Sequence, residues 1–244
     1  MSPVIDWDVV REALPLFVRG WGVTLLLLSS ALAAGFVLAV PLAVLRVSRY
    51  PLLALPVRAF TFVFRGTPLL VQLSLVYYGL AQFPAIRESV AWPLLRDAWF
   101  CAWASFTLNT TAYTTEIFAG ALRATPAGEL EAARAIGMDA VAQYRYVLLP
   151  AALRRALPQY GNEVVGVMHA TAIVSAVSLV DLTRVARDVY ATSLLPLEAF
   201  GTVAVFYFAT TFGLVGLFRL AEQRWLGHLR ATVTVAPAGA AHAH

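Results

Sequence analysis

The chain has 244 residues, of which 60% are hydrophobic and 13% charged, and its mean hydropathy is +0.72. Soluble domains average roughly 45–50% apolar and about 25% charged residues, so the composition indicates an integral membrane protein and excludes a sizeable soluble domain. All 18 basic residues are arginine, which excludes a Walker A nucleotide site, because that loop needs a lysine to reach the phosphates.

Five apolar segments are long enough to cross a bilayer, since a helical span needs about 20 mostly apolar residues. We therefore predict an all-α membrane protein with a membrane domain over 21–226. Residues 1–20 are expected on the periplasmic side, and the Ala-rich tail 227–244, which also contains Gly and Pro, is expected to be disordered in the cytoplasm. The predicted spans are about 21–45, 59–83, 98–122, 156–179 and 196–218.

The distribution of arginine predicts the orientation of these spans. If the N-terminus lies outside, twelve of the 18 arginines fall on the cytoplasmic side and six on the outer side. Cytoplasmic loops carry the excess of basic residues, so we predict an outer N-terminus and a cytoplasmic C-terminus. The same arginines are scattered and form no basic face, which argues against a nucleic acid partner.

The second predicted span contains the sequence Gly66-Thr67-Pro68. Proline removes a backbone donor and breaks or kinks a helix, so this stretch is expected to free backbone groups for Gln72 or for a solute. A kink that is only packed against neighbouring helices remains the alternative.

Polar side chains form two helically spaced stripes inside the third and fourth spans, and ionisable groups within a span are functional candidates by default. The stripes are Asn109, Tyr113, Glu116 and Gly120, and Asn162, Gly166, His169 and Ile173, with Glu163 beside the second. Residues at this spacing share one helix face, so they are expected to face a route for a polar solute, a partner helix or each other. The structural alternative pairs Glu116 and Glu163 with arginines near the cytoplasmic end, namely Arg65, Arg123, Arg154 or Arg155.

The predicted cytoplasmic loop 126–149 reads as two short helices. Thr125 can cap a helix that has Pro126 in its first turn, Gly137 is a natural stop, and Asp139 can cap a second helix. Pro150 is expected to end that second helix before the fourth span. From the residues alone, the loop is either an amphipathic hairpin resting on lipid headgroups or a surface that docks a protein.

The spacing of this loop resembles the EAA loop of ABC importer permeases. Glu131-Ala132-Ala133 is followed by three residues, Gly137, nine residues and then Val147-Leu148-Leu149-Pro150, with Val147 in place of the family's Ile. The resemblance implies that the loop docks on a cytoplasmic ATPase and couples its closure to the spans. The residues expected to do so are Glu131, Ala132, Ala133, Gly137, Asp139 and Pro150.

Three more segments, 64–73, 108–117 and 156–163, resemble permeases of the polar amino acid family, and within it the M-type permeases of histidine/lysine/arginine/ornithine importers. The resemblance covers roughly 20–226. It implies a multi-pass subunit of the bacterial inner membrane that imports a polar, basic amino acid, with an opine as the alternative. Implied partners are a cytoplasmic ABC ATPase dimer that holds ATP and Mg, a second homologous permease that is a distinct chain, a periplasmic substrate-binding protein, and membrane lipid.

No catalytic, cofactor or metal site is expected in this chain. The polar stripes and the resemblance together predict a substrate pathway. Its residues are Thr67, Gln72, Asn109, Tyr113, Glu116, Asn162, Glu163, His169 and Thr171. Many relatives carry Lys-Asp-Thr-Ser where this chain has His169-Ala170-Thr171-Ala172. Because that acid is missing here, we expect the partner permease to hold more of the substrate site, and His169 to be either a substrate contact or a structural residue.

Two other functional classes stay open at this point. One is an ion-coupled secondary transporter that uses Glu116 or Glu163, although five spans are few and internal repeats are not visible. The other is a membrane scaffold whose loop binds a partner.

Overall fold

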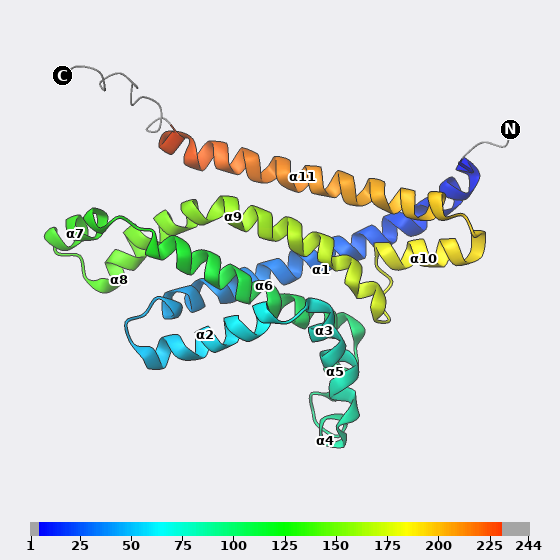
Figure 1. The fold of residues 1–244 in the computed structure, drawn as a ribbon, viewed down its shortest axis with the longest axis horizontal. Coiled ribbons are helices and arrows are strands. Elements are labelled where there is room, and N and C mark those ends of the chain that lie inside the picture. The colour runs from blue at the N-terminus through cyan, green and yellow to red at the C-terminus, as the bar shows by residue number, and fades with distance from the viewer. Residues whose placement is uncertain (1–4, 231–244) are drawn as a thin grey trace, which may run out of the picture.

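The computed structural model describes residues 5–230, and all of its regular elements in that range are helical (Figure 1). The predicted all-α class is therefore confirmed for the described residues. The elements are α1 Trp7–Arg46, α2 Pro51–Gly66, α3 Leu69–Ser74, the π-helical η1 Leu75–Gly79, the 3-10 turn η2 Leu80–Gln82, α4 Pro84–Arg87, α5 Trp92–Leu95, α6 Ala98–Arg123, α7 Ala127–Ala135, α8 Ala140–Ala142, the π-helical η3 Gln143–Leu148, α9 Leu149–Ala170, the 3-10 helix η4 Thr171–Ala176, α10 Leu182–Ser193 and α11 Pro196–Arg230.

Helix α6 lies in the middle of the bundle and packs against α1, α2, α3 and α9 (Figure 1). Its threonines Thr110, Thr111, Thr114 and Thr115 are at most 1% exposed. Small residues at helix contacts let backbones in a membrane approach closely. The approach of α1 is so close that a Cβ on Gly35 would collide with the Thr110 side chain.

By length and apolar composition, fewer helices could cross a membrane than the five spans predicted from the sequence. Among the described residues, α1 and Pro196–Leu226 of α11 are long and apolar enough to cross, and α2 with Leu69–Gln82 adds a third if the bent pair counts as one span. Helices α6 and α9 do not meet this test. The polar threonines of α6 face protein rather than lipid. Five spans and an outer N-terminus are thus not confirmed and stay predictions.

Several predicted boundaries need correction. The span 98–122 matches α6 closely. The predicted span 59–83 is divided between two helices, because the helix axis bends by 100° between α2 and Leu69–Gln82, and whether this pair crosses as one span stays a prediction. In place of the span 156–179, α9 begins at Leu149 and gives way to the 3-10 helix η4 after Ala170. The disordered tail predicted from 227 is wrong for 227–230, which belong to α11, whereas 231–244 lie outside the described residues.

Candidate functional site

Helices α2 and α3 are separated by a two-residue break at Thr67 and Pro68. Proline pushes the preceding residue away from helical angles, and Thr67 accordingly has φ −117° and ψ 139°. The side-chain amide nitrogen of Gln72 lies 2.8 Å from the Phe64 carbonyl oxygen, 3.0 Å from the Thr67 carbonyl oxygen and 2.8 Å from the Thr67 hydroxyl. The predicted break is confirmed, and Gln72 donates to two of the carbonyls near it, those of Phe64 and Thr67.

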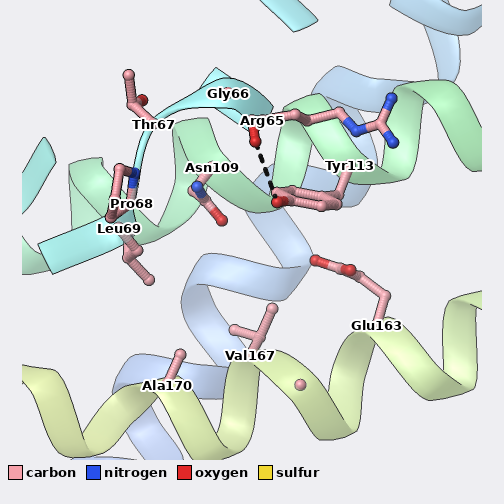
Figure 2. Close-up of a pocket in the computed structure, with 11 residues that line it drawn as sticks. Arg65, Gly66, Thr67, Pro68, Leu69, Asn109, Tyr113, Glu163, Val167 and Ala170 are labelled. Atoms are coloured by element: carbon pink, nitrogen blue, oxygen red, sulfur yellow. Dashed lines mark hydrogen bonds between the residues drawn. The ribbon is translucent and has the colours of Figure 1, made fainter. Parts of the chain in front are cut away.

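A cavity of about 440 Å³ lies beside this break, and we call it the first cavity (Figure 2). Three elements that are far apart in the sequence form its walls: the break itself, the middle of α6 and the second half of α9. They contribute Arg65 to Leu69, Asn109 and Tyr113, and Glu163, Gly166, Val167 and Ala170, respectively.

The wall from α6 is held to the break by polar contacts. Asn109 donates to the side-chain oxygen of Gln72 at 3.2 Å and to the Phe64 carbonyl at 3.3 Å. The Arg65 guanidinium lies over the Tyr113 ring, 5.2 Å from its centroid, and the Tyr113 hydroxyl donates to the Arg65 carbonyl at 3.4 Å. Guanidinium groups are attracted to aromatic faces at this range, so Arg65 is positioned by Tyr113 rather than by an acid.

Glu163 stands on the opposite wall. Its side chain rises from α9 towards Tyr113, across the cavity from the break (Figure 2). It forms no ion pair within 4 Å among the described residues, and neither does Arg65. One carboxylate, one guanidinium and the amide of Asn109 therefore line the same small space. Groups of this kind can hold a solute that carries both charges.

Glu116 lies outside the first cavity, although its spacing predicts the same face as Asn109 and Tyr113. One of its carboxylate oxygens accepts from Arg46 Nε at 2.6 Å and from the Thr61 hydroxyl at 2.8 Å, and the other lies 3.8 Å from Arg123. The proposed pairing with Arg123 is confirmed. Arg46 and Thr61 are partners that the sequence did not reveal, because they come from α1 and α2.

Two residues of the predicted stripe on α9, Asn162 and His169, face α11 rather than the first cavity. Asn162 lines a separate cavity with Phe218 of α11, and the His169 ring nitrogen lies 3.1 Å from the Thr211 hydroxyl, also on α11. Thr171 is fully buried and donates to the Met168 carbonyl at 2.6 Å. Helix α9 packs between α6 and α11, so it has two polar faces. Of the predicted pathway, Thr67, Asn109, Tyr113 and Glu163 meet at the first cavity.

The loop after α6 has the predicted bend. Gly137 has φ +79°, a left-handed angle that disfavours any side chain, and it follows the end of α7. Asp139 then caps α8 by accepting from the Ala142 amide at 2.7 Å. Both of these predictions are confirmed.

Two other predictions for the loop are wrong. Thr125 caps nothing, because Pro126 occupies the cap position and the Thr125 hydroxyl accepts from Arg155 at 2.8 Å. Arg155 also pairs with Glu129 at 2.9 Å, not with Glu116 or Glu163. Pro150 does not end a helix: it lies in the first turn of α9, where a proline is tolerated, and the π-helical η3 runs directly into that turn.

The bent loop presents apolar side chains to its surroundings. Ile136 and Val141 are each 73% exposed and Tyr146 is 64% exposed, while Ala133 is buried. Of the other residues of the EAA motif, Glu131 and Ala132 are exposed. An exposed apolar group of this kind, beside charged residues, is typical of a surface that contacts another protein or the membrane.

Comparison with known proteins decides the family. The family model of binding-protein-dependent transport system inner membrane components matches residues 31–227. The chain belongs to this family. The match includes both walls of the first cavity and the whole EAA loop, and it places this permease among components of the inner membrane.

Curated relatives agree with the family. The permease is 45% identical over 211 residues to the histidine/lysine/arginine/ornithine transport system permease protein HisM of Salmonella typhimurium, covering 86% of this chain and 90% of that one. It is 45% identical over 192 residues to the octopine transport system permease protein OccM of Rhizobium radiobacter, covering 79% and 78%.

Solved structures show the same fold. A crystal structure of an amino acid ABC transporter with histidines superposes with a TM-score of 0.80 at 32% identity, covering 90% of this chain and 99% of that one. An inward-facing MetNI methionine transporter gives 0.69 at 24% identity, covering 89% and 96%, and supports the fold alone. The chain is thus a permease subunit of an amino acid ABC importer.

Proposed function

We propose that this permease carries a basic amino acid and holds it in the first cavity. The observation that carries the proposal is Glu163, a carboxylate without an ion pair among the described residues, facing a cavity that also contains the Arg65 guanidinium. A charged group inside a membrane protein is costly unless it meets a partner. In the proposal, the cationic end of the solute contacts Glu163, and its carboxylate contacts Arg65. Asn109 and the broken helix supply hydrogen bonds.

An opine is the second candidate, because the octopine permease OccM is also 45% identical to this chain. An opine carries one carboxylate more than the parent amino acid and needs a second cation to balance it. The first cavity has Arg65 as its single guanidinium among the described residues. This favours a basic amino acid over an opine.

Transport is proposed to depend on three kinds of protein partner. An ABC ATPase dimer with ATP and Mg docks on the loop 126–149 in the cytoplasm, a distinct second permease completes the pathway, and a periplasmic binding protein delivers the solute. Exposed Ile136, Val141 and Tyr146 support the docking role of the loop. The orientation follows from the arginine bias, with the N-terminus outside and five spans in the inner membrane.

The substrate is tested by uptake into proteoliposomes that contain the assembled transporter, internal ATP and external binding protein. We expect arginine, lysine, histidine or ornithine to be taken up, and octopine and glutamine to compete poorly. Uptake of octopine in preference to all four would show that the substrate is an opine rather than a basic amino acid. Uptake that runs on a proton or sodium gradient without ATP would instead support the ion-coupled transporter.

The coupling role of the loop is tested by comparing alanine substitutions at two of its glycines. Gly137→Ala places a side chain at φ +79° and costs roughly 1–2 kcal/mol in the bent conformation, so we expect ATP hydrolysis to become uncoupled from uptake. Gly128→Ala is the matched control, because Gly128 lies in α7 at an ordinary helical angle with open space around it. Equal uptake per ATP in both variants would contradict the proposal.

A further inference from the structure

A second cavity of about 590 Å³ lies beside the first cavity, and its lining comes from α2, the end of α1 and Glu116 of α6. The two cavities share Arg65 and Gly66. Three guanidinium groups line the second cavity, those of Arg46, Arg58 and Arg65, and its one acid is Glu116. Glu116 is already held by Arg46 and Thr61. The cavity therefore carries an excess of two positive charges that its own residues do not balance.

The basic side of this cavity is not closed by other parts of the described chain. Arg58 is exposed and forms no ion pair within residues 5–226, for which side chains are described. It lies seven residues after the start of α2, about 10 Å along the helix at ~1.5 Å per residue. Arg46 ends α1 at the same end of the bundle. The cationic site thus joins the C-terminal end of α1 to the middle of α2, which has 16 residues.

One strip of the cavity wall is apolar and faces outwards. Phe62 is 80% exposed and Leu55 is 64% exposed, and Ala59 lies between them on α2. The wall therefore joins the exposed Arg58 to an apolar strip that points away from the bundle. A ligand that fits both parts needs an anionic head and a hydrocarbon tail.

We propose that the second cavity binds an anionic phospholipid, whose phosphate contacts Arg58 and whose acyl chain lies along Ala59 and Phe62. Basic pockets between transmembrane helices bind anionic headgroups, and each arginine near the headgroup contributes about 1 kcal/mol. The excess of positive charge selects an anionic lipid over a zwitterionic one. Because the cavity adjoins the first cavity through Arg65, the lipid occupies the flank of the proposed transport site.

The test uses the complete assembled transporter in bilayer discs that contain equal amounts of phosphatidylglycerol and phosphatidylethanolamine. The assembly is then extracted with detergent, and native mass spectrometry identifies the lipids that it retains. We expect phosphatidylglycerol to be enriched on the wild-type assembly. Arg58→Gln should reduce this enrichment roughly fivefold, because one arginine–phosphate contact is lost. Ala59→Trp should abolish it by filling the cavity without changing its charge.

Arg49→Gln is the matched control, since Arg49 is exposed in the adjoining turn, contacts Tyr50 and does not line the cavity. It should retain the wild-type enrichment, and millimolar inorganic phosphate should not displace the lipid. Equal loss in Arg49→Gln and Arg58→Gln, or no enrichment at all, would overturn the proposal. Displacement by phosphate would identify a free anion as the ligand. Enrichment on the isolated chain that disappears in the assembly would show that the second permease covers the cavity.

Discussion

Two glutamates inside the bundle, Glu116 and Glu163, have the same chemistry but different surroundings. Glu116 contacts Arg46, Thr61 and Arg123, and its side chain is 15% exposed. Glu163 faces the first cavity and has no ion pair among the described residues. The first therefore joins α1, α2 and α6, whereas the second is the acid that we propose contacts the ligand. In this account, position relative to neighbouring helices, not residue type, separates a structural acid from a binding acid.

The largest effect on transport is expected from Glu163→Gln. Losing one partner of a buried charge pair costs about 2–5 kcal/mol, so uptake of a basic amino acid at limiting concentration should fall about 30-fold or more. The measurement is initial uptake of labelled arginine into proteoliposomes. The melting temperature should not fall, because no ion pair in the described protein is lost.

Glu116→Gln serves as the matched comparison for that result, since the same change is made on a neighbouring helix. If both variants lose uptake equally while both remain folded, the division between the two acids is wrong. If Glu163→Gln keeps wild-type uptake, the first cavity is not where the cation is recognised.

The largest effect on stability is expected from Glu116→Gln. Removing one partner from a mostly buried pair leaves Arg46 uncompensated and costs about 3 kcal/mol. We expect a clearly lower melting temperature in detergent, measured by thermal unfolding of the purified chain. The double change Glu116→Gln with Arg46→Gln should recover part of this loss, because it removes the unpaired charge. A double variant that is as unstable as the sum of the single ones would show that the two residues do not act as a pair.

The smallest effect is expected from Tyr113→Phe. The hydroxyl makes a 3.4 Å contact with the Arg65 carbonyl, and the ring beneath the guanidinium remains. A single hydrogen bond of this kind contributes about 1 kcal/mol or less, so arginine uptake should fall less than fivefold. Tyr113→Ala removes the ring as well and should fall further. Equal uptake in both variants would show that the ring does not position Arg65.

Local sequence signals predicted much of this arrangement. Pro68 predicted the break in the second span, Asp139 the cap of α8, and Gly137 the bend before it. Each of these depends on a residue and its immediate neighbours, so one stretch of sequence is enough to reveal it. The bounds of α6 were predicted for a similar reason, since they follow an apolar run of span length; the structure adds Asp97 as its N-terminal cap.

Contacts between distant segments were not predictable in the same way. Arg46 and Glu116 are 70 residues apart in the chain, and only the packing of α1 on α6 brings them together. The separation of His169 and Asn162 from Glu163 depends on α11 covering one side of α9. Helical spacing gives the direction of a side chain around one helix, but it does not tell which neighbour lies in that direction.

The most direct test of the account is an experimental structure of the assembled transporter with bound arginine. We predict density for the amino acid in the first cavity, with its guanidinium within hydrogen-bond distance of the Glu163 carboxylate and its carboxylate facing Arg65. Arginine bound only in the second permease, or beside Glu116 with the first cavity free of ligand, would contradict the account.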